Sequence, residues 1–234
     1  RTADRATAYA GEDAGLADLI MSQELRSSLY AFDLVQRRAK KPAGAPESWL
    51  ARPVTKVGVV GAGLMASQLA LLFLRRLEVP VVISDLDAER VQKGIGYVHA
   101  ELDKLLAKRR IKSDQVNRHW ALLSGTTEHA DYADCDFVIE AVFEEMSVKK
   151  QVFASLEKHV SPECLLATNT SSLSVTEMAA ELEHPERVIG FHFFNPVAVL
   201  PLLEVIRGQA TDDETAATAL SVAKSRRPSW STGC

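Results

Sequence analysis

The stretch Lys56-Val-Gly-Val-Val60, followed at once by Gly61-Ala-Gly63-Leu-Met-Ala66, decides the fold. Its first half is a short apolar run typical of a buried strand, and a helical stretch at 64–77 follows the glycines. Between a strand and a helix, Gly61 permits a tight turn, Gly63 lets the backbone approach a pyrophosphate, and the small Ala66 allows close helix–sheet packing. We therefore predict that the helix N-terminus binds the phosphates of a dinucleotide.

A carboxylate follows the next predicted strand, at 79–83. Asp85 is placed to accept hydrogen bonds from the ribose hydroxyls of a bound adenosine and to repel a 2′-phosphate, which favours NAD over NADP, with FAD a weaker alternative. Alternatively, Asp85 or Asp87 caps the helix that begins at 88. We expect both roles, with Asp87 as the cap and Asp85 as the ribose ligand.

Strands and helices alternate along the rest of the chain. This alternation predicts an α/β fold, a Rossmann-type doubly wound parallel sheet with an inserted helical pair at 88–109 and 114–121. Ser174 begins a capping-box pattern with Glu177 and predicts another helix start. The remaining strands are expected at 122–126, 136–142, 164–168 and 187–193, with a further helix at 148–159.

The two ends of the chain differ from this pattern. Apolar residues at helical spacing predict one linker helix over 12–41, and the proline- and glycine-containing segment 42–48 indicates a boundary. We therefore divide the chain into a linker helix segment at 1–50, a dinucleotide-binding domain at 51–208 and a C-terminal tail at 209–234. The tail ends without strand-like alternation, and we expect it to be truncated or aberrant.

Composition excludes several classes of function. Of the 234 residues, 47% are hydrophobic and 25% are charged, as in ordinary globular proteins, and the net charge of −4 gives no basic field for nucleic acid. No apolar run approaches the roughly 20 residues that span a bilayer. Cys135, Cys164 and Cys234 lack the spacing of a metal site, so we expect no metal, reduced thiols and a cytoplasmic location.

His192 differs from the other five histidines in its position. It lies in Val188-Ile-Gly-Phe-His-Phe-Phe-Asn-Pro196, near the carboxyl end of a predicted strand, where parallel sheets bind ligands. Position alone leaves open a packed core histidine. Glu204 lies in a second apolar run, where a carboxylate is costly unless paired, so pairing with His192 would orient the imidazole. The alternative is an exposed glutamate on an edge strand.

The hydroxyl-rich segment Thr168-Asn-Thr-Ser-Ser172 ends another strand on the same predicted edge. Its hydroxyl groups are placed to hold a substrate alcohol, and the alternative is a plain turn.

Four motifs in this order resemble the 3-hydroxyacyl-CoA dehydrogenase family over about residues 54–208. They are Gly61-Ala-Gly-Leu-Met65, Val138-Ile-Glu-Ala-Val142 with Glu144, Thr168-Asn-Thr-Ser-Ser-Leu173, and Gly190-Phe-His-Phe-Phe-Asn-Pro-Val197 with Leu203-Glu-Val205. The first 50 residues resemble the linker helix of multifunctional fatty-acid oxidation proteins. That likeness implies an enoyl-CoA hydratase domain upstream and a helical dehydrogenase domain downstream.

The resemblance implies a role for each matching residue. His192 would be the general base, Glu204 its partner, and Ser171 a hydrogen-bond partner of the substrate hydroxyl. NAD would be held by Gly61, Gly63, Met65, Asp85, Val142, Phe143, Glu144, Lys149, Ser171 and Asn195. Glu140 matches a motif position without a catalytic role. The implied reaction is the NAD-dependent oxidation of a 3-hydroxyacyl-CoA to a 3-ketoacyl-CoA.

Two departures from the family limit this expectation. Ala66 replaces the third glycine of the turn, and residues 224–234 replace the strand and helical domain with which the family continues. We therefore expect an incomplete dehydrogenase unit that binds NADH and turns over acyl-CoA poorly. The alternatives are a non-catalytic NAD-binding remnant and a dehydrogenase of small hydroxyacids that lack CoA.

Overall fold

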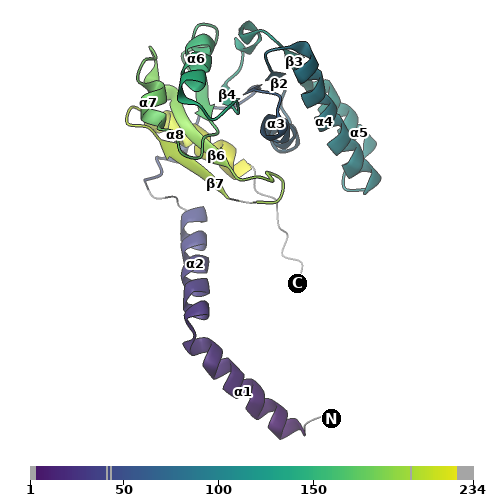
Figure 1. Ribbon diagram of the computed structural model, residues 1–234, viewed down its shortest axis with the longest axis vertical. Coiled ribbons are helices and arrows are strands. Elements are labelled where there is room, and N and C mark those ends of the chain that lie inside the picture. Colours follow the sequence, from purple (N-terminus) through teal and green to yellow (C-terminus); the bar gives the residue numbers. More distant parts are fainter. Residues whose placement is uncertain (1–3, 41, 43, 201, 226–234) are drawn as a thin grey trace. The chain divides into compact units, whose positions relative to one another are not determined.

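The computed structural model describes residues 4–40, 42, 44–200 and 202–225. The chain divides into two compact units, with the boundary between Ala45 and Pro46 (Figure 1). None of the helices in the described ranges combines the length and apolar character that crossing a bilayer requires. Residues 226–234, which include Cys234 and form the end of the predicted tail, lie outside the described residues.

The N-terminal unit holds two helices, α1 (Arg5–Met21) and α2 (Gln23–Lys40), where the sequence predicted one. Ser22 adopts an extended conformation between them, and its hydroxyl oxygen accepts a hydrogen bond from the Leu25 N–H at 3.1 Å. The extended conformation of Ser22 ends α1, and its hydroxyl oxygen is the N-cap with which α2 starts. The apolar stripe that predicted the helix stays exposed, with Leu29 58% and Phe32 64% accessible.

The second unit is an α/β domain with a seven-stranded sheet in the order β3-β2-β1-β4-β5-β6-β7. All neighbouring strands are parallel except β6 and β7, which are antiparallel. This confirms the predicted Rossmann-type fold. The strands are β1 (Val57–Val60), β2 (Val81–Ser84), β3 (Leu123–Thr126), β4 (Phe137–Glu140), β5 (Leu165–Thr168), β6 (Val188–Phe193) and β7 (Leu203–Arg207).

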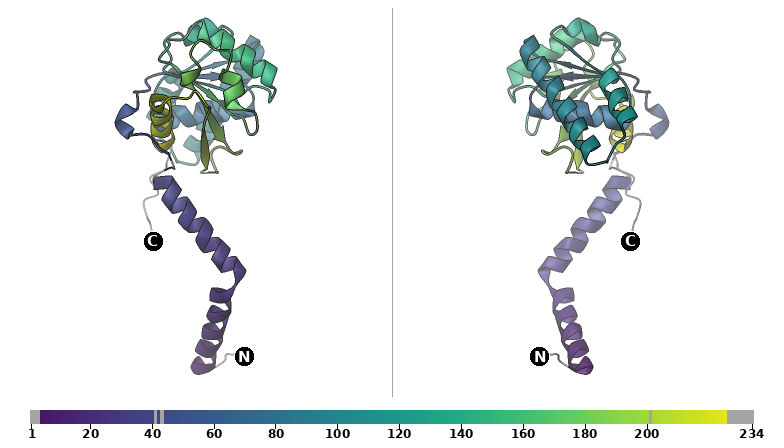
Figure 2. Two further views of the ribbon diagram at one scale, coloured as in Figure 1. Left: turned by 90° about the vertical axis from the view of Figure 1, so that its left-hand side faces the viewer. Right: turned by 90° about the vertical axis from the view of Figure 1, so that its right-hand side faces the viewer.

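Helices cover both faces of the sheet (Figure 2). One face packs against α3 (Leu64–Leu77), α4 (Ala88–Ala107), α5 (Ser113–Leu122) and α8 (Asp213–Ser225). The other packs against the short helix η2 (His129–Tyr132), α6 (Met146–Glu157) and α7 (Val175–Ala179). Two further 3-10 turns, η1 (Ser48–Leu50) and η3 (Pro185–Arg187), complete the domain.

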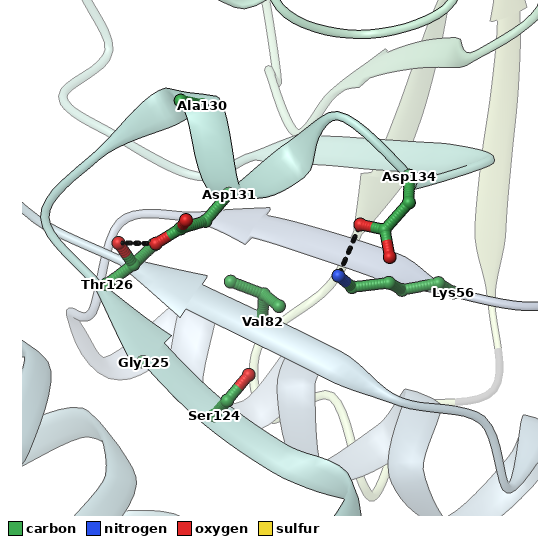
Figure 3. Close-up of a pocket in the computed structure, with 8 residues that line it drawn as sticks. All are labelled: Lys56, Val82, Ser124, Gly125, Thr126, Ala130, Asp131 and Asp134. Carbon is green, nitrogen blue, oxygen red and sulfur yellow. Dashed lines mark hydrogen bonds and ion pairs between the residues drawn. The ribbon is translucent and has the colours of Figure 1, made fainter.

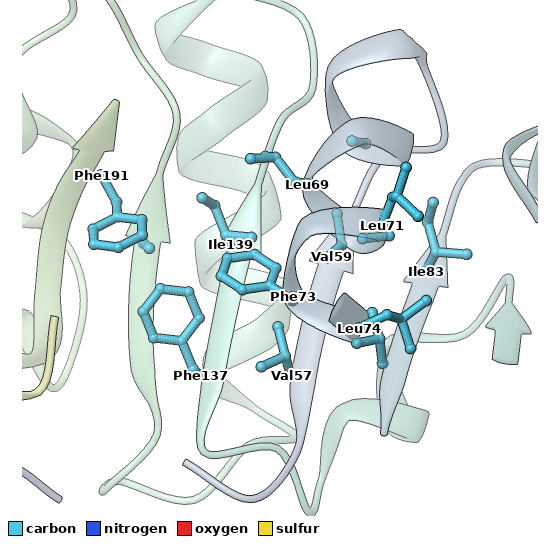
Figure 4. Packing of buried hydrophobic residues seen from close by; sticks show 14 of the residues in the cluster. Val57, Val59, Leu69, Leu71, Phe73, Leu74, Ile83, Phe137, Ile139 and Phe191 are labelled. Atoms are coloured by element: carbon cyan, nitrogen blue, oxygen red, sulfur yellow. The ribbon is translucent and has the colours of Figure 1, made fainter. Parts of the chain in front are cut away.

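The strand residues alternate between these two cores, as a pleated strand requires. Val57 and Val59 of β1 face α3, whereas Val60 faces the α6 side. In the larger core, Phe73 of α3 packs against Phe137 of β4, which in turn packs against Phe191 of β6 (Figure 4). The same alternation puts residues 138 and 140 of β4, and residues 166 and 168 of β5, on the α6 side of the sheet.

Both predicted boundaries of the dinucleotide-binding domain shift. At its start, η1 contacts α8, so residues 46–50 belong to this unit and not to the linker segment. At its end, α8 buries Ala216, Ala219 and Val222 against the sheet, so the domain continues past residue 208. The Asp212 carboxylate accepts a hydrogen bond from the Thr215 N–H at 2.7 Å, an N-cap signal that the sequence analysis missed.

Candidate functional site

The turn between β1 and α3 is built as the glycine pattern requires. Gly61 has φ of 104°, a left-handed conformation that favours glycine, and a Cβ there would lie 3.0 Å from the carbonyl oxygen of Ala141. Gly63 caps α3, and a Cβ built on it would meet nothing within 4 Å. The helix N-terminus therefore opens onto free space, which suits a phosphate group.

Asp85 lies beside this turn, directly after β2. Its carboxylate accepts hydrogen bonds from the N–H groups of Ala62 and Leu86, both at 2.8 Å, and Arg90 approaches to 3.5 Å. Asp87 caps α4 by accepting the Arg90 N–H at 2.9 Å, as predicted. Asp85 thus holds the glycine turn in shape, a structural role that the sequence analysis did not foresee, and its remaining lone pairs are suited to a ribose.

A buried ion pair lies beneath the ends of β4 and β5. Glu140 and Lys149 are both fully buried, and the Lys149 ammonium contacts the two Glu140 carboxylate oxygens at 2.7 and 2.9 Å. The register sets Glu140 beside Thr168, whose hydroxyl donates to the same carboxylate. Lys149, expected to line the cofactor site, lies on α6 itself and its side chain is fully buried. It reaches the sheet edge through its second contact, with Glu144 at 3.2 Å.

Glu144 connects this buried pair to the hydroxyl-rich loop. Its carboxylate accepts hydrogen bonds from the Thr170 hydroxyl and from the Ser171 N–H, the latter at 3.0 Å. Partial burial raises the pKa of Glu144, but these hydrogen bonds and the Lys149 charge outweigh it and lower the pKa below 4.5. An ionised Glu144 therefore fixes the backbone at Ser171.

The segment around Glu144 presents further predicted residues. The Val142 N–H donates to Glu140 at 3.2 Å, so the buried carboxylate also holds the start of this loop. Phe143 is 77% exposed, and Val142 is half-buried. Met65, in the first turn of α3, is also half-buried.

His192 and Glu204 face each other across β6 and β7. They are register partners in the antiparallel pair, and His192 Nδ1 lies 2.9 Å from a Glu204 carboxylate oxygen. The side chain of His192 is 14% exposed and that of Glu204 is 51% exposed. When Nδ1–H donates to the carboxylate, Nε2 keeps its lone pair, which is the form a general base needs.

The loop that contains Ser171 and the strand that carries His192 are joined at the end of β5. The Asn169 amide oxygen accepts the Phe193 N–H at 2.9 Å, which ties the Ser171 loop to the end of β6. Ser171 is exposed, and within the described part of the chain it makes no hydrogen bond to His192. Sequence reasoning missed the contributions of Asn169 and Thr170, although both lie in the hydroxyl-rich motif.

One cavity lies away from this edge. A polar pocket of about 410 Å³ between β3 and η2 is lined by Lys56, Val82, Ser124, Gly125, Thr126, Ala130, Asp131 and Asp134. Figure 3 shows Lys56 directed at Asp134 and Thr126 directed at Asp131. These groups satisfy one another, and none of the predicted site residues lines the pocket. We therefore place the functional site at the open carboxyl edge.

Comparisons with known proteins relate this chain to one enzyme family. Residues 56–227 match the family model for the NAD-binding domain of 3-hydroxyacyl-CoA dehydrogenase. The alpha subunit of the fatty acid oxidation complex of Idiomarina loihiensis is 34% identical over 203 residues, covering 87% of this chain and 28% of that protein. The chain thus spans less than a third of this relative.

Solved structures give the same relationship. The 3-hydroxybutyryl-CoA dehydrogenase of Escherichia coli K12 superposes with a TM-score of 0.72 and 36% identity, covering 75% of this chain and 37% of that one. The (S)-3-hydroxybutyryl-CoA dehydrogenase of Ralstonia eutropha superposes with a TM-score of 0.71 and 35% identity, covering 74% of this chain and 61% of that one. The chain therefore belongs to the 3-hydroxyacyl-CoA dehydrogenase family, of which it carries the NAD-binding domain.

Proposed function

We propose that this chain forms the NAD-binding part of an enzyme that oxidises 3-hydroxyacyl-CoA thioesters to 3-ketoacyl-CoA in fatty-acid β-oxidation. The observation that carries the proposal is the His192–Glu204 pair at 2.9 Å, on the same sheet edge as the glycine turn. A base beside a dinucleotide site is what the oxidation of an alcohol requires.

His192 acts as the general base in this proposal. Its Nε2 takes the proton of the 3-hydroxyl group as the C3–H bond breaks. NAD⁺ held at the glycine turn would supply the hydride acceptor. Glu204 keeps the proton of His192 on Nδ1 and stabilises the imidazolium that forms. Ser171 donates to or accepts from the substrate oxygen, which holds C3 in place. A positioned base contributes about 10²- to 10⁴-fold in rate.

The cofactor residues divide by position. Gly61 and Gly63 leave room for the pyrophosphate, and Asp85 accepts from the adenine ribose. Val142, Phe143 and Glu144 would line the nicotinamide side, because these residues follow β4, the neighbour of β1 on the side away from β2. The remaining proposed ligands are Met65, Lys149, which acts through Glu144, and Asn195.

Two measurements test the proposal. Titration with NADH, followed by its fluorescence, gives the cofactor affinity of this chain. The acetoacetyl-CoA reduction rate is measured in the full-length protein, where His192→Gln lowers kcat by at least about 100-fold, as expected for the loss of a general base. His159→Gln, at an exposed histidine near the end of α6, serves as the matched control. A full rate in the His192→Gln protein would remove His192 as the base.

The same assay separates the alternatives. A remnant that binds NADH without chemistry shows no turnover even in the full-length protein. A dehydrogenase of small hydroxyacids oxidises free 3-hydroxybutyrate as fast as its CoA thioester. The proposal requires the thioester to be strongly preferred.

The relatives support a proposal about partner domains. We propose an enoyl-CoA hydratase domain upstream and a helical dehydrogenase domain downstream, because the related Idiomarina protein is a much longer alpha subunit. We also propose a cytoplasmic location. It is supported by the free, buried thiols of Cys135 and Cys164, which a reducing compartment preserves.

A further inference from the structure

Gln68 links the phosphate-binding helix to the loop that follows β6. It lies on α3, two residues after Ala66, and its side chain bridges two groups of that loop. Its Oε1 accepts the Val197 N–H at 2.9 Å, and its Nε2 donates to Asn195 Oδ1 at 3.3 Å. Neither the glycine pattern nor the proposed function assigns Gln68 a role.

The backbone determines which way both amides point. Val197 is buried, and its N–H can only donate, so the Gln68 atom facing it must be the carbonyl oxygen. The Gln68 amide nitrogen then faces Asn195, which in turn must direct its own carbonyl oxygen inward. The Asn195 NH₂ group therefore faces outward. In the described ranges no group accepts from it, and Asn195 is exposed.

The position of Asn195 relates it to one half of a dinucleotide. The glycine turn and Asp85 lie at the ends of β1 and β2, on the adenine side of the sheet. Asn195 follows β6, on the opposite side of the turn, where the nicotinamide riboside of a bound dinucleotide would extend. Contact of Phe73 on α3 with Phe193 on β6, at 6.4 Å between ring centroids, keeps the helix and this loop together.

We propose that Gln68 is a positioning residue that fixes Asn195 as a hydrogen-bond donor to an acceptor oxygen of the nicotinamide riboside. The inference rests on the proposed function, because it requires a bound dinucleotide. Its distinctive consequence is selectivity within one ligand. Changes at Gln68 weaken the nicotinamide half and leave the adenosine pyrophosphate half unaffected.

Two substitutions at Gln68 separate its effect on the orientation of the Asn195 amide from its role in anchoring the loop after β6. Gln68→Met keeps the length of the side chain and loses both hydrogen bonds. Gln68→Glu keeps an acceptor for the Val197 N–H but can no longer donate to Asn195, so the Asn195 amide inverts and presents oxygen to the ligand. Gln92→Met and Gln92→Glu, at an exposed position on α4, are the matched controls.

The readout is the ratio of the dissociation constants for NADH and ADP, measured by calorimetry or fluorescence on this chain. ADP carries the adenosine and both phosphates without the nicotinamide riboside, so the ratio removes any charge effect of Gln68→Glu at the pyrophosphate. We expect each Gln68 substitution to shift the ratio against NADH by about 3- to 10-fold, the effect of one hydrogen bond. The Gln92 variants leave it unchanged.

The Asn195→Ala background completes the test. Asn195→Ala alone shifts the ratio of the NADH and ADP dissociation constants. Adding Gln68→Met or Gln68→Glu to this variant causes no further shift, because the two residues act through one hydrogen bond. Additive effects would overturn the proposal, as would equal weakening of NADH and ADP. A Gln68→Glu protein with the wild-type ratio would show that Gln68 only anchors the loop. Failure of the wild type to bind NADH would overturn the proposed function and this inference together.

Discussion

The two halves of the sheet's carboxyl edge are built in different ways. At β1 and β2, a bare backbone turn forms the surface, and the Asp85 carboxylate accepts hydrogen bonds from a backbone N–H of that turn and from the N–H of the next residue. At β4 to β7, this edge depends on side-chain pairs from different elements, chiefly the fully buried Glu140–Lys149 pair and the His192–Glu204 pair, in which Glu204 is half exposed. The first half is a local motif, and the second exists only once the whole sheet has formed.

This difference predicts how each half responds to substitution. Changes in the backbone turn alter ligand access or local strain, whereas changes in the buried network leave charges without partners. Stability therefore depends more on the second half. Four experiments, ordered by expected effect, examine this contrast.

The largest effect is expected for Lys149→Met. This change leaves the fully buried Glu140 carboxylate without its cation, which costs about 3–5 kcal/mol of unfolding free energy for a broken buried pair. Urea denaturation measures it. The neighbouring Lys150→Met is the matched control, because Lys150 pairs with Glu177 and Glu181 near the surface, where a pair contributes at most about 1 kcal/mol. Equal losses in the two variants would contradict the special role of the buried pair.

Gly61→Ala and Gly63→Ala separate strain from ligand access. At Gly61, the positive φ and the Ala141 oxygen at 3.0 Å predict a loss of about 1–3 kcal/mol in stability. At Gly63 an added Cβ meets no protein atom, so stability is unchanged within about 0.5 kcal/mol, while NADH binding weakens because the methyl group enters the phosphate space. Thermal melts and NADH titrations measure the two effects. Unaltered NADH binding in Gly63→Ala would remove this turn as the phosphate site.

The fold was largely predictable from sequence because its signals are local. The glycine turn, the apolar strands and the Asp87 cap each depend on residues close in the chain. Two features escaped prediction. The Ser22 cap divides the N-terminal helix without a glycine or proline, and α8 buries small alanines, which give a weaker apolar signal than leucine or valine.

The site was predictable only in part, for a related reason. The His192–Glu204 contact could be anticipated because two apolar runs of similar length follow each other and pair as neighbours. The burial of Lys149 could not, because it depends on α6 lying over the end of β4. Gln68 was also missed, since its partners in the loop after β6 lie far along the chain.

Asp85→Asn and Asp87→Asn compare two carboxylates of the first half. Asp85 accepts two backbone N–H groups with different oxygens, and an amide can accept only one of them, so we expect a loss of about 1 kcal/mol. We also expect Asp85→Asn to lower the affinity for NADH. Asp87 is a helix cap, a role that asparagine fills equally well, so its substitution has little effect on either quantity. Thermal melts and NADH titrations on both variants test this, and matching behaviour of the two would contradict it.

The smallest effect is a pH dependence in the second half of the edge. The pKa of Glu144 is lowered below 4.5 in the folded protein, so its ionised form contributes stability above pH 4.5, and that contribution is lost as the pH falls through the lowered value. Glu144→Gln removes this titration, so its unfolding free energy falls less steeply below pH 4.5 than that of the wild type. Urea denaturation between pH 3 and pH 6, in steps of about half a unit, measures the slopes. Glu145→Gln, next in the chain, is the matched control. An unchanged slope in Glu144→Gln would mean that another group sets the acid dependence and that the buried network does not hold Glu144 in its ionised form.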